Sequence, residues 1–480
     1  PLANKGKSCL FWNKNEEVMM KKNLHRTALL LSIGLPYGMH AGEIPDKPNI
    51  LIFIADDLGW EEVGAYGHPV VRTPNIDSLA LNGLRFDNFF LTASSSSPSR
   101  ASIFTGMYPS STRAQNLHDK LPSEATLFTD CLQKNGYYTM LVGKNHGTNS
   151  PEIEKRFDYL KSVGKPWKMG DLWVEALRQR PKDKPFFMFA ASLDPHRPYK
   201  QGAYDNPYRP SEVIIPPYLP DSPEMREDIA DYYNEVTRFD THVGAVLNLL
   251  REEKELTNTL IIVMTDNGRP FAQCKTRVNT QGIKSPFIVF YPHIVRKGGV
   301  TSSLASAVDI APTLLEIADA KRSPGLQGIS LLPILNNPDT EVREFAFAEH
   351  NWHAFKAYER AVITKEFIYI KNWLPHLSNP VVGDAMRTPA YLQMLADFEK
   401  GRLGEIYQDC FIAPRSEEEL YSLAKDIHCL NNIAHKRTMK EELSRLRLVL
   451  KVWQESVGDV FPGEENIKQD DGRFARPLGR

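Results

Sequence analysis

The sequence predicts an α/β fold in which helices cover a large sheet, followed by a smaller C-terminal α+β domain. From residue 49 onward, short apolar runs rich in β-branched and aromatic residues alternate with longer stretches of helical periodicity. After about residue 335 the pattern changes to closely spaced short strands and one closing helix. The chain has 480 residues, of which 42% are hydrophobic, so it can form more than one core.

Local signals define the elements expected in the larger domain, 46–335. Residues 50–55 form a continuous apolar run, which is typical of a strand buried on both faces. A helix is expected to begin after Thr73, with a proline in its first turn, and to end at Gly83. Apolar side chains at helical spacing predict a long amphipathic helix over 226–256. Further strands are expected at 138–142, 186–190, 260–264 and 287–291.

The smaller domain is expected to span 336–480. It begins with Asn-Asn-Pro-Asp at 336–339, whose turn-forming residues predict a linker. A meander of short strands is expected next, at 345–349, 361–364 and 367–373, and a helix at 440–453. We therefore expect an antiparallel sheet with one long helix.

Charge and cysteine content exclude several classes of protein. Lys and Arg number 58 against 59 Asp and Glu, so neither a nucleic-acid partner nor stable membrane insertion is expected. Four of the five cysteines lie beyond the leader and show no Cys-x-x-Cys spacing, which argues against a zinc cluster. Whether they form a disulfide stays open, with Cys410 and Cys429 the nearest pair.

The first 41 residues resemble a targeting segment. Positive charges at 20–26 precede an apolar run at 28–35, and Met-His-Ala at 39–41 is typical of a cleavage site. Eight apolar residues are too few to span a bilayer. We expect a cleaved signal peptide and export to the periplasm or the medium. Residues 1–18 precede a plausible start at Met19 or Met20 and are excluded from the fold prediction.

Oxygen-bearing side chains follow two of the predicted strands. Asp56 and Asp57 come directly after the first strand, and Asp266 and Asn267 follow the strand at 260–264. A single such pair is more often a turn or a helix cap. Two pairs at the carboxyl ends of strands predict one site for a hard cation, Ca²⁺ or Mg²⁺.

The most specific motif is Ser-x-Pro-x-Arg, which begins at Ser96, ends at Arg100 and is followed by Thr-Gly at 105–106. A Ser-rich loop capping a helix would explain the serines alone, but not the full eleven-residue pattern. With this motif the chain resembles the formylglycine-dependent type I sulfatases of the alkaline phosphatase superfamily. The likeness extends from residue 49 to about residue 453.

The resemblance implies an alkaline-phosphatase-like mixed sheet between helices and a formylglycine made from Ser96 by a sulfatase-maturing enzyme. It also implies one Ca²⁺ ion, with residue 96 joining the four ligands at the strand ends. Lys144 and His146 match the family's Gly-Lys-x-His motif, and His196 matches its Pro-His motif. Lys275 falls where the family places a cation that holds the sulfate, with Arg277 as a nearby competitor.

The resemblance assigns roles to these residues. Arg100 and Lys144 hold the nucleophile, His196 together with Lys275 protonates the leaving group, and His146 acts as the base that releases sulfate. Taken singly, each histidine would more often be a core or surface residue.

Within the family, the sequence around Ser96 and the Asp-Pro-His-Arg motif at 194–197 are particularly similar to those of the heparan N-sulfatases. A sulfated glycan, with N-sulfoglucosamine units of heparin or heparan sulfate, is therefore the expected substrate. Two positions differ: Ser96 stands where those enzymes have Cys, and Lys275 where they have Arg. An O-sulfatase therefore stays open, as do a phosphatase or phosphonate hydrolase and a glycan-binding protein without catalysis.

Four further residues are expected to contact the glycan. Glu349, His350 and His353 lie in an aromatic-rich stretch of the smaller domain, and His118 precedes the Gly-Lys-x-His motif. A packed edge strand explains the first three equally well.

Overall fold

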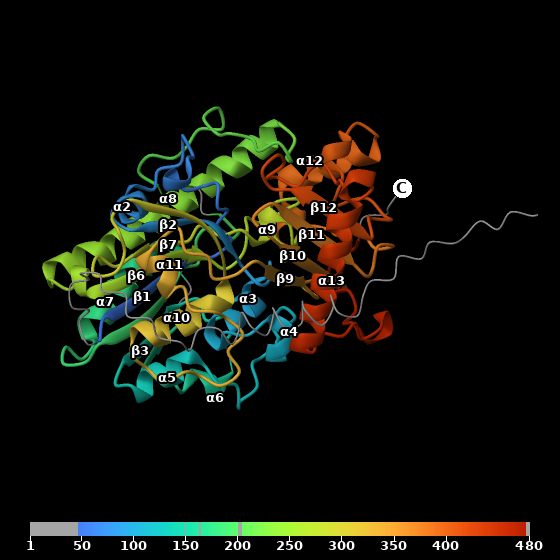
Figure 1. Ribbon diagram of the computed structural model, residues 1–480. Coiled ribbons are helices and arrows are strands. Elements are labelled where there is room, and N and C mark those ends of the chain that lie inside the picture. Colours follow the sequence, from blue (N-terminus) through green and yellow to red (C-terminus); the bar gives the residue numbers. More distant parts are fainter. Residues whose placement is uncertain (1–46, 149, 163–164, 200–203, 477–480) are drawn as a thin grey trace, which may run out of the picture. The chain divides into compact units, whose positions relative to one another are not determined.

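An eight-stranded sheet, ordered β4-β3-β5-β1-β6-β7-β2-β8, organises the larger part of the structure (Figure 1). The structure is a computed structural model that describes residues 47–148, 150–162, 165–199 and 204–476. The predicted signal peptide lies outside these residues. The strands are β1 Asn49–Ala55, β2 Leu84–Phe90, β3 Tyr138–Gly143, β4 Tyr159–Lys161, β5 Phe186–Ala191, β6 Thr259–Thr265, β7 Ile288–Phe290 and β8 Gly299–Ser306.

The sheet is mixed. Strands β4, β3, β5, β1 and β6 run parallel, whereas β7 pairs antiparallel with both β6 and β2. In the register between β1 and β6, Ala55 faces Thr265. Asp56 and Asp266 are the next residues on these two strands, so they leave the sheet side by side at its carboxyl edge.

Helices cover both faces of this sheet, as Figure 1 shows. One face packs against α2 Pro74–Asn82, α7 Met169–Gln179 and α8 Pro223–Glu252. The other packs against α3 Ser96–Thr105, α5 Phe128–Lys134 and α10 Ile310–Ile317. Shorter helices are α4 Pro109–Thr112, α6 Pro151–Glu154, α9 Thr280–Ile283 and α11 Leu332–Asn336.

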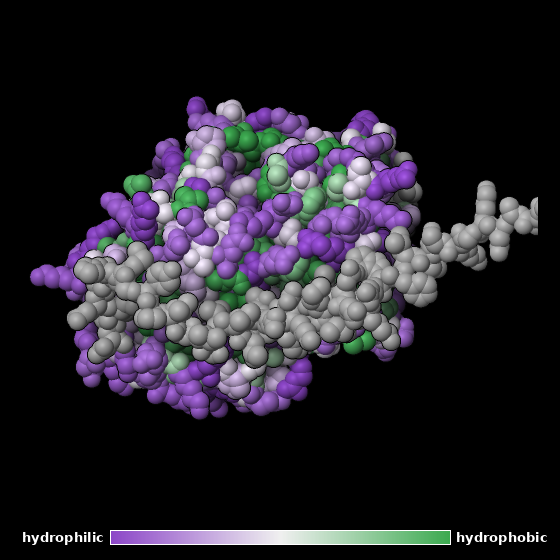
Figure 2. All heavy atoms as spheres, in the orientation of Figure 1, coloured by the Kyte–Doolittle hydropathy of each residue, from purple (hydrophilic) through white to green (hydrophobic). Residues whose placement is uncertain are grey.

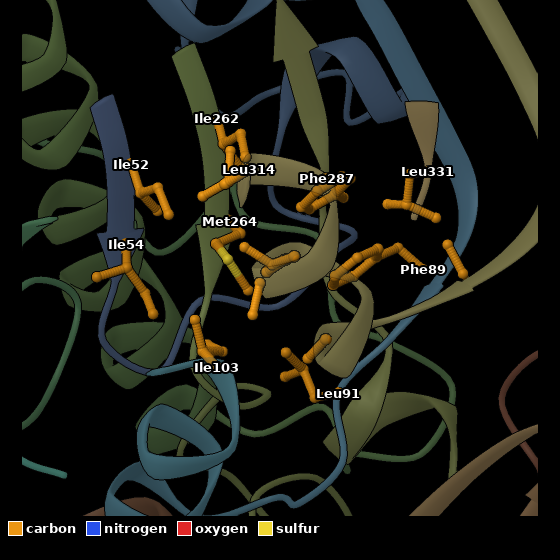
Figure 3. Close-up of a cluster of buried hydrophobic side chains, with 14 of the residues drawn as sticks. Ile52, Ile54, Phe89, Leu91, Ile103, Ile262, Met264, Phe287, Leu314 and Leu331 are labelled. Carbon is orange, nitrogen blue, oxygen red and sulfur yellow. The ribbon is translucent and has the colours of Figure 1, made fainter. Parts of the chain in front are cut away.

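Strand β1 has apolar side chains on both faces because it is buried between the two helical layers. Ile50, Ile52 and Ile54 belong to one core cluster, and the alternate residues Leu51 and Phe53 belong to the other. Figure 3 shows part of the first cluster, in which Ile103 of α3 lies beside Ile54 of β1 and Met264 of β6. The helix that begins at Ser96 is thereby packed against the strands that end in the acidic residues.

A second, antiparallel sheet has the order β12-β11-β10-β9. Its strands are β9 Ala346–His350, β10 Glu359–Ile363, β11 Phe367–Asn372 and β12 Glu418–Ser422, with α12 Pro389–Glu399 and α13 Lys440–Val457 in the same part of the chain. The Glu349 amide of β9 donates to the Thr92 carbonyl at 2.8 Å. This bond joins the second sheet to the segment that leads into α3.

The predicted fold class is confirmed, and most predicted elements lie within a few residues of their expected positions. The helix expected after Thr73 is α2, with Thr73 and Gly83 as its caps. The long helix begins earlier than predicted, because Ser222 caps it at the Met225 amide and Pro223 occupies its first turn. Strands β2, β4, β8 and β12 were not predicted, since charged or small polar residues interrupt their apolar pattern. The boundary at 335/336 stays a prediction.

The face drawn in Figure 2 is mainly hydrophilic, with hydrophobic residues in separate small groups. Among the described residues, no helix is both long and apolar enough to cross a membrane. The four cysteines of the described part, Cys131, Cys274, Cys410 and Cys429, are buried free thiols, so the pairing left open between Cys410 and Cys429 does not form here.

Candidate active site

Three carboxylates meet at the carboxyl edge of the large sheet. One oxygen each of Asp56, Asp57 and Asp266 lies within 4.8 Å of the others, and all three side chains are fully buried. Asp57 has a left-handed φ of 74°, which turns the chain immediately after β1. Asn267 donates its Nδ2 to Asp57 Oδ1 at 2.7 Å, so its own Oδ1 is available to the cluster.

Three cations surround these carboxylates. Lys144 Nζ lies 2.7 and 2.6 Å from the two oxygens of Asp56. Arg100 Nε donates to Asp266 Oδ2 at 2.8 Å, and Lys275 Nζ donates to Asp57 Oδ1 at 2.6 Å. Burial alone would raise the pKa of Asp56, but the charges of Lys144, His196 and Arg100 together hold it below its usual value. Asp56 is therefore kept ionised although it is buried.

Ser96 lies where the two strand ends and α3 meet. Its hydroxyl is 3.0 Å from Asn267 Oδ1 and 3.3 Å from Asp56 Oδ1. It is the first residue of α3, a ten-residue helix whose positive N-terminal end favours negative charge at this position. A nucleophile at residue 96 would therefore stand against the acidic cluster and in a favourable field for an anion.

Two glycines explain why the Gly-Lys-x-His-Gly loop lies close enough to the acidic cluster for Lys144 to contact Asp56. Gly143 ends β3 with φ of 113°, and a Cβ there would lie 1.8 Å from the Ala191 carbonyl oxygen. Gly147, with φ of 148°, brings the loop against Arg100, whose Cβ would be 2.8 Å from an added Cβ. Only glycines allow this close approach, which places Lys144 between them on Asp56.

His146 and His118 form a pair beside the cluster. His146 Nε2 lies 2.9 Å from His118 Nδ1, and the His118 amide donates to Ser97 Oγ at 2.8 Å. Burial, followed by the charges of Lys144 and Arg100, lowers the pKa of His146 to about 2. His146 is therefore neutral at neutral pH, with one of its ring nitrogens unprotonated.

His196 approaches from the loop after β5. Its Nδ1 contacts the Arg197 carbonyl oxygen, and its Nε2 lies 3.9 Å from Asp57 Oδ2. The loop is held by Asp194, which pairs with Arg238 of α8 at 2.9 and 2.5 Å and whose carbonyl accepts from the Asp56 amide. Because a carbonyl accepts from Nδ1–H, the reactive nitrogen facing the site is Nε2.

Lys275 and Arg277, the two competing cations, face in different directions. Lys275 contacts Asp57, whereas Arg277 pairs with Glu359, Asp409 and Glu419 at 3.4, 3.2 and 3.5 Å. The structure thus brings Lys275 to the acidic cluster and leaves Arg277 in an ionic network beside the second sheet.

The four candidates for glycan contact fall into two groups. His118 lies beside His146, and His353 Nδ1 is 2.8 Å from Ser95 Oγ, directly before Ser96. Glu349, in contrast, accepts from the Ser110 amide and hydroxyl, and His350 Nδ1 lies 3.6 Å from Glu359. Glu349 and His350 therefore contact Ser110 and Glu359 rather than residues next to Ser96. The glycan role of all four candidates stays a prediction.

The donors fit a hard divalent cation. The Asp57 Oδ2 atom is buried without a hydrogen-bond partner among the described residues, and Asp57 belongs to the cluster in which one oxygen each of three carboxylates lies within 4.8 Å of the others. Asp56, Asp57, Asp266 and Asn267 could hold such an ion, with residue 96 beside them. Oxygen ligands without sulfur or imidazole favour Ca²⁺ or Mg²⁺ over zinc.

Sequence reasoning missed two residues at this site. Ser95 contacts His353, but in the sequence it is one of four consecutive serines and carries no separate signal. Asp384 lies 3.9 Å from His196 Nε2, although it belongs to a loop far along the chain without a recognisable motif. Only the folded chain brings these residues to the site.

A buried acidic cluster at the carboxyl edge of a helix-covered mixed sheet, with a nucleophile position beside it, defines a hydrolase of the alkaline-phosphatase-like fold. The sulfatase family model matches residues 48–320. A second model, described as the C-terminal part of N-sulphoglucosamine sulphohydrolase, matches residues 274–382.

Individual proteins agree with these matches. The chain is 30% identical over 463 residues to the N-sulphoglucosamine sulphohydrolase of Homo sapiens, covering 86% of this chain and 91% of that protein. It is 28% identical over 469 residues to an ulvan-active sulfatase of Formosa agariphila, covering 87% of this chain and 76% of that protein. The chain belongs to the sulfatase family, enzymes that hydrolyse sulfate esters or sulfamates.

A solved structure shares the fold. It has a TM-score of 0.66 and 20% sequence identity, and the match covers 88% of this chain and all of that one. That protein was solved with D-glucosamine-2-N,6-O-disulfate, described as its substrate. The predicted family and fold are thereby confirmed.

Proposed function

We propose that this sulfatase is exported, binds one Ca²⁺ ion, and removes the N-sulfate from N-sulfoglucosamine units of heparin or heparan sulfate. The observation that carries the catalytic part is the position of Ser96, 3.0 and 3.3 Å from two oxygens of the candidate metal ligands. Support for the substrate comes from the similarity to the human N-sulphoglucosamine sulphohydrolase, which extends over most of both chains.

The proposed nucleophile is a formylglycine made from Ser96 by a maturing enzyme. Its hydrate would supply two hydroxyls on one carbon, one to attack sulfur and one whose deprotonation releases the bound sulfate. A bound Ca²⁺ would polarise the sulfate oxygens. The same ligand set serves Mg²⁺, and the choice of Ca²⁺ follows the family resemblance.

The chain's own residues orient the reactants and transfer protons. Lys144 and Arg100 hold Asp56 and Asp266 in place and supply positive charge beside the nucleophile. His146, which is neutral at neutral pH, acts as the base that takes the proton from the second hydroxyl. Lys275 binds a sulfate oxygen from the side of Asp57.

His196 serves as the acid for the leaving group. Its Nε2 faces the site while its Nδ1 is fixed by the Arg197 carbonyl. Proton donation to the departing nitrogen or oxygen prevents a build-up of negative charge there. His118 and His353, which contact the neighbours Ser97 and Ser95 of Ser96, are proposed to contact the sugar.

An assay with four substrates tests this function. Sulfate or phosphate release is measured with N-sulfoglucosamine, glucosamine 6-O-sulfate, p-nitrophenyl sulfate and p-nitrophenyl phosphate, on enzyme produced with a maturase that accepts serine. We expect the highest kcat/KM with N-sulfoglucosamine. A preference for the 6-O-sulfate would replace the proposal with an O-sulfatase, and a preference for the phosphate would replace it with a phosphatase. The Ser96→Ala variant is the control for contaminating activity.

A further inference from the structure

Asp384 lies on the leaving-group side of the site. One of its carboxylate oxygens is 3.9 Å from His196 Nε2, the same distance that separates this nitrogen from Asp57. The other oxygen accepts from the Ala385 amide at 2.9 Å. With 35% of its side chain exposed, Asp384 can be reached from solvent, whereas Asp57 is fully buried.

The segment that carries Asp384 is fixed by packing. Val381 and Val382 are buried, and Gly383 lies so close to Phe474 that a Cβ would be 2.2 Å from the ring. Arg387, three residues further on, lies over the same ring at 5.4 Å. The Asp384 backbone is therefore anchored on the C-terminal segment, and its carboxylate has a defined position beside His196.

Asp384 contributes negative charge to the site, and among the described residues no permanent cation lies within ion-pair distance of it. The two permanent cations near it, Lys275 and Arg197, already have closer carboxylates: Asp57 at 2.6 Å and Asp228 at 2.6 Å. Among the described residues, His196, which is charged only when protonated, is the one basic side chain within ion-pair distance of Asp384. A partly exposed carboxylate without its own permanent cation favours a positively charged group on a ligand.

We propose that Asp384 recognises the amine of the glucosamine product and thereby selects N-sulfate over O-sulfate, an inference that rests on the function proposed above. As the S–N bond breaks, its electron pair stays on nitrogen, which takes a proton from His196. The free amine then takes a second proton from water and becomes an ammonium. A sulfamate nitrogen that is protonated while the S–N bond breaks carries positive charge already in the transition state, whereas the less basic oxygen of a sulfate ester gains much less, so the N-sulfated substrate gains more from Asp384.

Calorimetry on the full chain in the presence of Ca²⁺ tests the binding part. Glucosamine and N-acetylglucosamine are titrated at about pH 6, where a primary amine is protonated. We expect the wild type to prefer glucosamine, and Asp384→Asn to weaken glucosamine binding about tenfold without changing that of N-acetylglucosamine. Asp397→Asn, which removes a carboxylate paired with Arg402 on the surface of α12, should retain the preference.

Kinetics on the matured enzyme provide the second measurement. Asp384→Asn should lower kcat/KM about tenfold for N-sulfoglucosamine and change it less than about threefold for p-nitrophenyl sulfate. Equal losses on both substrates, or an unchanged preference for glucosamine in calorimetry, would overturn the role of Asp384. If the wild type releases no sulfate from N-sulfoglucosamine, the proposed function itself fails. Matching melting temperatures of variant and wild type ensure that folding is not the cause.

Discussion

At the scale of single residues, charge balance explains how the site tolerates three buried carboxylates. Lys144, Arg100 and Lys275 supply three positive charges to Asp56, Asp57 and Asp266. The protein alone is therefore close to neutral at this point, and a divalent ion adds an excess of two positive charges. Such an excess attracts a sulfated substrate into a site where water screens little of the field.

Lys144→Ala tests the catalytic part of this balance. Lys144 is placed to stabilise charge in the transition state, so we expect turnover to fall by about a hundredfold. Stability should fall much less, because Arg100 remains beside Asp56. Turnover and urea unfolding are measured on the same preparation, with the surface variant Lys161→Ala as control. Equal free-energy losses in catalysis and folding would indicate a structural role for Lys144.

Calcium should stabilise the folded chain. At about 100 times its Kd, an ion that binds only the folded state raises the free energy of unfolding by about 2.7 kcal/mol. A chelator should therefore lower the melting temperature, and added Ca²⁺ should restore it. Asp57→Asn should abolish the response, whereas Asp397→Asn should keep it. A response that persists in Asp57→Asn would place the ion elsewhere.

At the scale of elements, hydrogen bonds between loops and helices hold the layers together. His68, in the loop before α2, makes several such bonds. Its Nδ1 accepts from the Val70 and Val71 amides at 3.1 and 2.9 Å. Its Nε2 lies 2.9 Å from the hydroxyl of Tyr233 on α8. Because Nδ1 accepts two bonds, protonation of this ring would break both.

The pKa of His68 predicts acid sensitivity. Burial, followed by the charge of Arg269, lowers this pKa from about 6.5 to about 4. The unfolded chain therefore binds the proton first, so this contribution to stability is complete above pH 6.5 and is lost as the pH falls toward 4. When the pH falls from 6.5 to 4, the free energy of unfolding measured in urea should decrease less for His68→Gln than for the wild type. His435→Gln, at an exposed position, should behave like the wild type.

The elements nearest the site were also the most predictable from sequence. Strands β1 and β6 are continuous apolar runs followed by acidic residues, so both the strands and their ligands could be predicted. The Ser-x-Pro-x-Arg motif likewise marked residue 96, although the helix α3 that begins there was not predicted. Strand β8, with the sequence GVTSSLAS, has no apolar alternation because its stability comes from pairing with β2.

At the scale of the whole molecule, an ionic network links the second sheet to the loop of Lys275. Arg277, two residues after Lys275, is 5% exposed and pairs with Glu359 of β10, Glu419 of β12 and Asp409. Arg415 adds a second contact to Glu359. The smaller sheet therefore holds a loop of the candidate active site.

Arg277→Met should destabilise the whole fold. Removing one partner from a buried ionic network costs about 3 kcal/mol or more, because the carboxylates stay buried without their cation. Burial raises the pKa of Asp409 to about 6 even though the charge of Arg277 lowers it. In the variant, protonation of Asp409 therefore removes a buried negative charge that has lost its cation. Its deficit in urea unfolding should be larger at pH 8 than at pH 5.5. A deficit no larger than that of the surface variant Arg445→Ala would contradict this role.

Contacts between distant segments were the part that the sequence did not reveal. Asp384 and His196 are separated by nearly two hundred residues, and Ser95 meets His353 from the loop after β9. No local period or motif encodes these pairs, because they depend on how the two sheets pack. Glu349 and His350, which were expected to contact the glycan, also contact Ser110 and Glu359 in the fold, and their glycan role stays a prediction.

The mass of the tryptic peptide 86–100 from an active preparation tests the central claim most directly. If residue 96 is the nucleophile beside the ion, active enzyme carries formylglycine there, and the peptide is two hydrogens lighter than its sequence requires. Sulfatase activity should rise in proportion to the converted fraction and be absent in Ser96→Ala. Full activity in enzyme whose residue 96 is entirely unmodified serine would contradict the account.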